Sequence, residues 1–215
     1  MFKAFSTLLL ALLFFAPVNK SQDILSRVAK VEITDSRGSG TCMAWPAGNI
    51  HYISAAHCFQ DVHQHVKVII GGNTQVGVVG LLDKEHDLAS VDVQSPVTGF
   101  EIAANVVKEG DKLKFVVFPD DEIRTPIFYN THNYGEYLII SDDGFQGPKR
   151  ILSNPVFPGM SGGPVLNNKN QVISVVQSFT HAKSGQWVSL VATYEDFMSF
   201  LDKLGINRPP PPPQQ

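Results

Sequence analysis

Short apolar runs separated by turn residues fill the chain after residue 22, and this pattern is typical of an all-β protein. Apolar and polar positions alternate over 28–33, as they do in a half-buried strand. Proline, glycine and asparagine gather at 46–49 and 71–73 and predict turns. The candidate strands that precede residue 96 are enough to close a small barrel. They are 28–33, 40–44, 51–54, 66–70, 75–81 and 88–93.

A second set of apolar runs follows a crossover segment at 95–110. Asparagines at 167–170 predict a hairpin turn between two of these runs. The simplest architecture is two six-stranded antiparallel β-barrels in series, the first at about 23–96 and the second at about 106–192. The candidate strands of the second set are 112–118, 126–129, 137–141, 150–153, 164–166, 171–178 and 187–192.

One α-helix is predicted at 193–205, after the second set of strands. Thr193 is placed to cap this helix, with Asp196 three residues later, and Gly205 ends it. Apolar side chains recur at helical spacing, and we interpret them as core packing rather than as a binding face. They are Tyr194, Phe197, Met198, Leu201 and Leu204. The proline-rich tail at 206–215 predicts an extended, polyproline-like segment, which is either an interaction peptide or a solvated stub.

The first 22 residues have the pattern of a signal peptide. Lys3 supplies a positive charge, 8–18 is almost wholly apolar, and 19–22 turns polar. This apolar run is shorter than the roughly 20 residues that span a bilayer, although an uncleaved membrane anchor is the alternative. We therefore expect an exported protein, secreted or periplasmic, with no stable membrane insertion after the signal is removed.

The net charge and the cysteines further limit the possible partners and covalent bonds of the chain. The net charge is −3 over 215 residues and no basic stripe is present, which argues against a nucleic-acid partner. The chain has two cysteines, Cys42 and Cys58, and in an exported protein they predict one disulfide. Such a bond closes a loop of about 15 residues and stabilises the fold by roughly 3 kcal/mol in the chain-entropy model. A metal site formed by the two thiols and His57 is the alternative.

The richest chemical signal is the stretch Gly-Met-Ser-Gly-Gly-Pro at 159–164. Glycines on both sides of Ser161 allow a tight turn whose backbone N–H groups point at one spot beside the serine hydroxyl. Acyl transfer needs this arrangement of a nucleophile next to an oxyanion hole. The same stretch also fits Gly-x-Ser-x-Gly, the nucleophile elbow of α/β-hydrolases.

The order of the other motifs separates these two possibilities. Ser54-Ala55-Ala56-His57-Cys58 and His86-Asp87-Leu88-Ala89 both precede the serine, so the order is histidine, aspartate, serine. The elbow fold requires serine, then the acid, then histidine, and only His181 follows the serine here. The chain also lacks the βαβ pattern of that fold, which argues against an α/β-hydrolase.

With three motifs in this order, the chain resembles the trypsin-like (chymotrypsin-fold) serine endopeptidases over about residues 25–200. It is most similar to their compact bacterial and viral type, including the protease domain of the HtrA group. The resemblance implies a double β-barrel with a C-terminal helix, protein or peptide substrates, and no cofactor or metal. It also implies a cystine at the place of Cys42 and Cys58. Met160 stands where digestive members have an aspartate, so activation through a freed amino terminus is not expected.

The resemblance assigns a role to each residue of a catalytic triad. Ser161 attacks the substrate carbonyl, and His57 removes its proton as the general base. Asp87 holds the second ring nitrogen of His57 and stabilises the imidazolium. The backbone N–H groups of Gly159 and Ser161 form the oxyanion hole. The aspartates that compete with Asp87 for the third role are Asp83 and Asp92.

Specificity is expected to depend on a pocket beside the serine. In the trypsin-like type the residue six before the nucleophile forms the pocket base, and here that residue is Pro155. No carboxylate lies between Asp143 and Ser161, so a preference for Lys or Arg is not expected and an apolar or small residue is favoured. The residues expected in the wall are Val176, Gln177, Ser178 and Phe179.

The sequence thus favours an exported serine-type endopeptidase that works through an acyl-enzyme intermediate. The alternative is a catalytically inactive protease fold used as a binding module. Such descendants usually lose a member of the triad, whereas His57, Asp87 and Ser161 are all present here.

Overall fold

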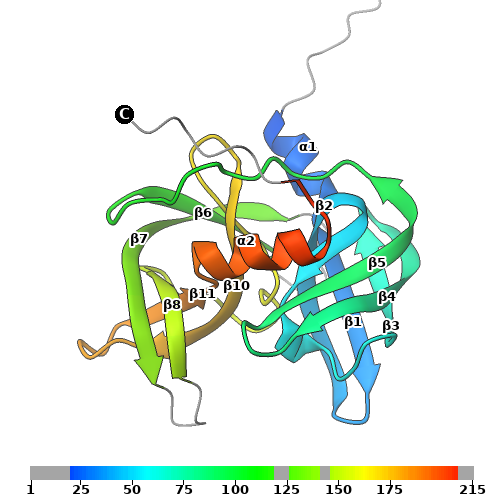
Figure 1. Cartoon of the computed structure of the whole chain (residues 1–215), viewed down its shortest axis with the longest axis horizontal. Helices are drawn as coiled ribbons and strands as arrows, with labels where there is room; N and C mark the ends of the chain where they lie inside the picture. Colours follow the sequence, from blue (N-terminus) through cyan, green and yellow to red (C-terminus); the bar gives the residue numbers. More distant parts are fainter. Residues whose placement is uncertain (1–19, 119–125, 141–145, 208–215) are drawn as a thin grey trace, which may run out of the picture.

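Two closed antiparallel β-barrels make up the body of the chain (Figure 1). The computed structural model describes residues 20–118, 126–140 and 146–207. Most of the expected signal peptide and of the proline-rich tail lie outside these residues. Within them, no helix combines the length and the apolar character needed to cross a membrane.

The first barrel has the strand order β1-β2-β5-β4-β3, and pairing of β1 with β3 closes it. A short helix precedes it, and a single 3₁₀ turn follows its second strand. The elements are α1 Lys20–Arg27, β1 Ala29–Asp35, β2 Gly38–Ser54, η1 Ala56–Cys58, β3 His65–Ile70, β4 Asn73–Asp83 and β5 Leu88–Val97.

The prediction of six strands for the first barrel is wrong, because two expected strands are one. β2 runs through 46–49, where we expected a turn. Gly48 and Asn49 adopt positive φ angles of 127° and 52°, and the pairing with β5 shifts register between Asn49 and His51. This irregularity bends the strand without ending it, so the barrel closes with five strands.

The second barrel has six strands, the number predicted, in the order β10-β11-β8-β7-β6-β9. The expected strands 126–129 and 137–141 belong to one strand, because β7 continues through Gly135 at a φ of 101° with a shift of register. The hairpin turn at 167–170 is confirmed by a hydrogen bond of 3.0 Å from the N–H of Asn170 to the carbonyl of Asn167. The elements are β6 Lys112–Val117, β7 Ile127–Ile140, β8 Gln146–Leu152, β9 Pro164–Leu166, β10 Val172–His181 and β11 Trp187–Val191.

The C-terminal helix α2, Tyr194–Lys203, packs across both barrels, and its expected cap is confirmed. The side chain of Thr193 accepts a hydrogen bond of 3.2 Å from the N–H of Asp196. Phe197 is fully buried, and its ring meets the edge of Trp45, a β2 residue, at 5.8 Å. The same hydrophobic cluster includes Phe115 of β6, so it spans the two barrels and the helix. The apolar stripe of the helix is therefore core, as predicted.

We expect Phe197→Ala to lower the free energy of unfolding by about 3–5 kcal/mol, because it leaves a cavity beside Trp45. Phe157→Ala is the control, since that ring is 59% exposed and its removal should change stability by less than about 0.5 kcal/mol. Urea unfolding of both variants measures the difference. Equal losses would contradict the assignment of α2 to the shared core.

Candidate active site

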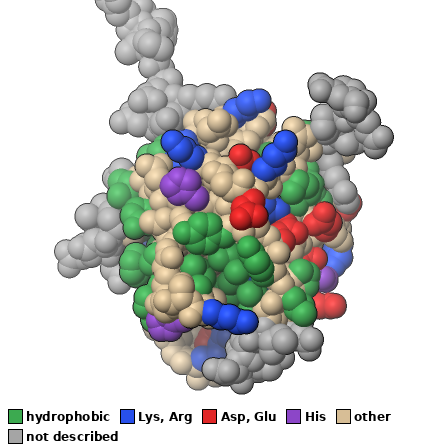
Figure 2. Space-filling model, turned by 90° about the vertical axis from the view of Figure 1, so that its left-hand side faces the viewer, with side chains coloured by type: hydrophobic (Ala, Val, Ile, Leu, Met, Phe, Trp, Pro, Cys, Tyr) green, Lys and Arg blue, Asp and Glu red, His purple; other side chains and the backbone are tan. Residues whose placement is uncertain are grey.

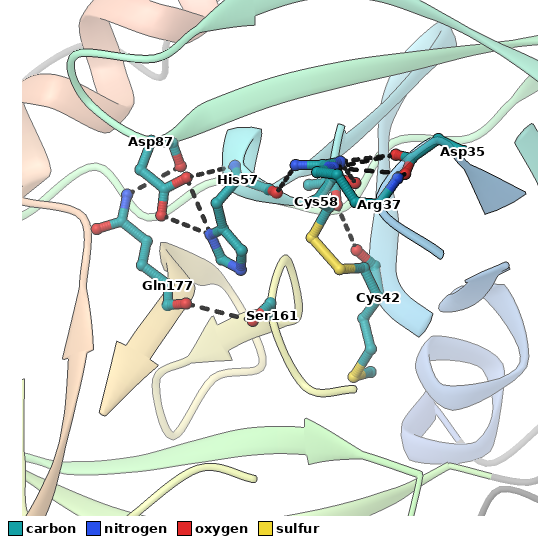
Figure 3. The surroundings of a disulfide bond; sticks show 10 residues. Asp35, Arg37, Cys42, His57, Cys58, Asp87, Ser161 and Gln177 are labelled. Atoms are coloured by element: carbon teal, nitrogen blue, oxygen red, sulfur yellow. Dashed lines mark hydrogen bonds and ion pairs between the residues drawn. A yellow bond between two sulfur atoms is a disulfide. The ribbon is translucent and has the colours of Figure 1, made fainter. Parts of the chain in front are cut away.

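The three residues expected to form the triad come from three separate segments that meet between the barrels (Figure 3). His57 lies in η1, directly after β2. Asp87 ends the turn between β4 and β5, and its φ of 55° places it in the left-handed region. Ser161 lies in the loop between β8 and β9 of the second barrel.

The histidine and the aspartate form a close pair. The Asp87 carboxylate lies 2.9 and 3.1 Å from Nδ1 of His57, and it accepts a further bond of 2.8 Å from the His57 backbone N–H. Nδ1 therefore carries the proton of a neutral ring, and Nε2 is left free to accept one. The competing acids bind other histidines, Asp83 to His86 and Asp92 to His51.

The serine hydroxyl is turned toward the backbone of β10. Ser161 Oγ donates to the carbonyl oxygen of Gln177 at 3.3 Å, and no hydrogen bond to His57 is present among the described residues. The ring of His57 points toward Ser161 in Figure 3. Bonds between a nucleophile and its base are often long before substrate binds, so this arrangement is compatible with catalysis.

The loop of the serine leaves two backbone N–H groups available. Met160 and Gly163 donate their N–H groups to carbonyls of Phe157 and Met160, each at 3.0 Å. Over the described parts of the chain, the N–H groups of Gly159 and Ser161 donate to no acceptor. Gly159 has a φ of 90°, a conformation that side chains other than glycine rarely adopt. These are the donors that were predicted for an oxyanion hole.

A close backbone approach fixes the serine loop against the first barrel. The carbonyl of Ser161 accepts a bond of 2.7 Å from the N–H of Met43 in β2. At Gly162, whose φ is 85°, an added Cβ would lie 2.1 Å from the carbonyl of Met43 and 2.3 Å from Oγ of Ser54. Only glycine fits here. Sequence reasoning found this glycine for its turn geometry but missed the contact between barrels.

The disulfide between Cys42 and Cys58 is present as predicted, and it joins β2 to the residue after His57. Both sulfur atoms and a ring nitrogen of His57 lie within 4.8 Å of one another, but the thiols are consumed by the bond. A metal site that uses them is therefore incompatible with this state of the chain.

Arg37 supports the same loop and was not found from the sequence. Its guanidinium donates to the carbonyls of His57 and Cys58 at 3.3 and 3.1 Å. Asp35 orients the guanidinium through a bond of 2.8 Å, and these hydrogen bonds lower the pKa of the Asp35 carboxyl. A short Asp-Ser-Arg hairpin near the first cysteine was the available signal.

The turn that ends at Asp87 is anchored to α2. His86 lies 3.0 Å from Asp83 and 3.6 Å from Asp196, and Lys203 binds Asp83 at 2.6 Å. Burial raises the pKa of Asp83, but the bonds from Lys203 and His86 outweigh it, and the pKa lies below its usual value. The segment next to Asp87 is thus tied to the C-terminal helix.

The residues expected around a specificity pocket differ in exposure. Val176 and Gln177 are buried, whereas Ser178 and Phe179 are exposed and Pro155 is half-buried. The ring of Phe179 meets Trp187 of β11 edge-on at 5.2 Å. Hydrophobic side chains gather on one face of the molecule in Figure 2, the side on which the second barrel lies in Figure 1. The pocket assignment stays a prediction.

Comparisons with known proteins agree with this fold. The trypsin-like peptidase domain family matches residues 38–175. No curated protein sequence matches the chain. The active form of the Rv3671c protease from M. tuberculosis is similar in structure, with 20% identity and a TM-score of 0.71 over 87% of this chain and 84% of that one.

Two further solved structures resemble the chain. The MamO protease domain from Magnetospirillum magneticum has 15% identity and a TM-score of 0.64 over 83% of this chain and 97% of that one. The HtrA-type protease AlgW with a tripeptide has 14% identity and a TM-score of 0.68, over 85% of this chain but 62% of that one. At such identities these likenesses show the fold.

We expect Gly162→Ala to be more destabilising than Gly185→Ala, although both glycines have nearly the same positive φ of 85° and 82°. An added Cβ at Gly185 meets open space, so that variant bears only the cost of the backbone conformation. At Gly162 the clash with Met43 and Ser54 adds about 1–3 kcal/mol. Urea unfolding compares the two, and equal losses would argue against the close contact between the barrels.

Proposed function

Because the chain belongs to the trypsin-like peptidase family, we propose that it is an exported serine endopeptidase that uses Ser161, His57 and Asp87 as its catalytic triad. The observation that carries this proposal is the hydrogen bond that Nδ1–H of His57 donates to the Asp87 carboxylate, which leaves Nε2 for the serine. The serine loop adds the N–H groups of Gly159 and Ser161, which donate to no acceptor within the described residues.

The reaction begins when Ser161 Oγ turns from the carbonyl of Gln177 toward Nε2 of His57. The hydroxyl attacks the substrate carbonyl carbon, and its proton passes to Nε2. Asp87 keeps its charge and stabilises the imidazolium. The N–H groups of Gly159 and Ser161 receive the negative oxygen of the tetrahedral intermediate, where one such donor typically lowers the barrier by about 3 kcal/mol.

Collapse of that intermediate breaks the peptide bond. The imidazolium of His57 donates its proton to the leaving amine, and an acyl-enzyme remains on Ser161. Water then attacks the ester, again with His57 as the base. His57 is well placed for this exchange because its side chain is 47% exposed, while Asp87 behind it is 21% exposed.

Export is supported by the disulfide, which persists in oxidising compartments, and by the signal-like first 22 residues. We keep the domain boundaries as proposals, with a signal peptide at 1–22, a protease domain at 23–205 and a tail at 206–215. The first of these boundaries falls within α1, Lys20–Arg27. The side chain of Ile24 in α1 is buried in the hydrophobic core, so we propose that at least part of α1 stays with the mature enzyme.

Substrates are proposed to carry an apolar or small residue before the cut. No carboxylate lies between Asp143 and Ser161 to attract a basic side chain, and the exposed ring of Phe179 lies in the expected pocket wall. The proline-rich tail is retained as a candidate interaction peptide.

A fluorophosphonate probe tests the triad. We expect the probe to label Ser161 in the oxidised mature chain, and label to be absent in Ser161→Ala. In Asp87→Asn the labelling rate should fall by up to about 10⁴-fold, because the ring of His57 is no longer held in the reactive tautomer. The labelling rate of His57→Ala should fall to a similar level. The labelling rate of the wild type should rise with pH as a single imidazole loses its proton.

The matched controls change the same types of residue at positions outside the proposed triad. Asp92→Asn alters the aspartate–histidine pair of Asp92 with His51, and Ser184→Ala removes an exposed hydroxyl, so both should label at the wild-type rate. Mass spectrometry locates the label. A folded, disulfide-bonded sample that takes no label would favour the inactive binding module instead.

A further inference from the structure

One residue of the second barrel contacts both Ser161 and the segment of Asp87 in the proposed triad. Gln177 lies in β10 and is 2% exposed. Its backbone carbonyl accepts from Ser161 Oγ at 3.3 Å. Its side-chain amide donates to the carbonyls of His86 and Asp87, at 2.6 and 3.0 Å. Figure 3 shows Gln177 between Ser161 and Asp87.

The acid segment is strained at the point where Gln177 holds it. Asp87 is one of four non-glycine residues with positive φ in the described part of the chain. This conformation costs an L-residue roughly 1–2 kcal/mol, so it persists only where neighbours hold the backbone. The two amide hydrogens of Gln177 bind the carbonyls on either side of the strained residue, while the Asp87 carboxylate faces His57.

A buried lysine fixes which way the amide of Gln177 points. Lys149 of β8 is 5% exposed, and its Nζ donates to Gln177 Oε1 at 2.6 Å. An ammonium can only donate, so the amide atom that faces it must be the oxygen. The NH₂ group must then face the carbonyls of His86 and Asp87, which can only accept. The donors and acceptors on both sides allow one orientation of the amide.

The charges around Lys149 belong to the same region. Burial lowers the pKa of Lys149, and the carboxylates of Asp87 and Asp196 act in the opposite direction. A lysine is rarely this buried, because removing an ammonium from water is costly. An apolar side chain at this position could not donate to Oε1 of Gln177, so it would leave the amide without the bond that orients it.

On this geometry, and resting on the proposed protease function, we propose that Gln177 and Lys149 are positioning residues for the catalytic acid. Gln177 holds the backbone of Asp87 from the opposite barrel, so that the carboxylate stays directed at Nδ1 of His57. Lys149 keeps the amide of Gln177 in the orientation that does this. The acid of the first barrel is thereby aligned by the barrel that carries the nucleophile.

The test uses Gln177→Glu in the oxidised chain, with Gln186→Glu as the matched control. The glutamate keeps the size of the side chain and an acceptor for Lys149, but its carboxylate cannot donate to the two carbonyls. Gln186 also donates an amide hydrogen to a backbone carbonyl, that of Ser153, away from the acid. A second pair of variants is Lys149→Met and its control Lys114→Met. Urea unfolding verifies that each variant is folded under the assay conditions.

The rate of fluorophosphonate labelling is the first readout. Gln177→Glu and Lys149→Met should slow labelling by about 10- to 100-fold, the scale of a misplaced catalytic group, while the controls stay within about twofold. In the Asp87→Asn background, Gln177→Glu should add less than about threefold, since the acid it aligns is already lost. Wild-type rates in both variants, or equal slowing with and without Asp87→Asn, would overturn the proposal.

The second readout does not depend on activity. A histidine Nδ1 proton bound to a carboxylate gives a downfield NMR resonance. His51 and His86 are also bonded to carboxylates through Nδ1, so the resonance of His57 is the one that disappears in Asp87→Asn. We expect this resonance in the wild type and the controls and its loss in Gln177→Glu. If it persists unchanged in both variants, the positioning role is wrong. If it behaves as expected while wild-type Ser161 takes no label, the positioning role stands and the proposed protease function fails.

Discussion

The contact on which the site depends most is the approach of the serine loop to β2. Gly162 brings backbone against the carbonyl of Met43 and the hydroxyl of Ser54, with no room for a side chain. Ser54 is the last residue of β2 and stands three positions before His57. The strand that leads to His57 is therefore also the surface on which the loop of Ser161 rests. The distance between these two residues depends on close backbone packing rather than on flexible side chains.

The two segments of the first barrel that carry His57 and Asp87 are held by several independent contacts. The disulfide and Arg37 tie the loop of His57 to β2 and to the hairpin before it. On the other side, the ion pair of Asp83 with Lys203 joins the turn that ends at Asp87 to α2, whose Phe197 is buried against the Trp45 of β2. These attachments come from the strands, from a covalent bond and from the C-terminal helix. Each removes freedom from a short segment that would otherwise have few neighbours to order it.

The parts that could be predicted from the sequence are those that local pattern controls. The order of His57, Asp87 and Ser161 and the glycines around the serine were enough to propose the triad, and Thr193 was enough to place the start of α2. The strand count of the first barrel failed because Gly48, which we interpreted as a turn residue, bends β2 without ending it. Period-two alternation cannot distinguish a bulge from a turn when both use glycine.

Tertiary polar contacts could not be predicted for a different reason. Lysine and glutamine are residue types that usually lie on the surface, and Gln177 was expected only in a pocket wall. Both Lys149 and Gln177 are nevertheless buried, and Gln177 binds carbonyls of the first barrel. A buried amide is stable only when every strong donor and acceptor around it is matched, so its partners constrain one another closely. This matching of donors with acceptors allows the amide side chain only one orientation, whereas apolar packing would allow several. The proposed alignment of Asp87 would need that selectivity, which an apolar side chain in place of Gln177 or Lys149 could not supply, because it has neither donor nor acceptor.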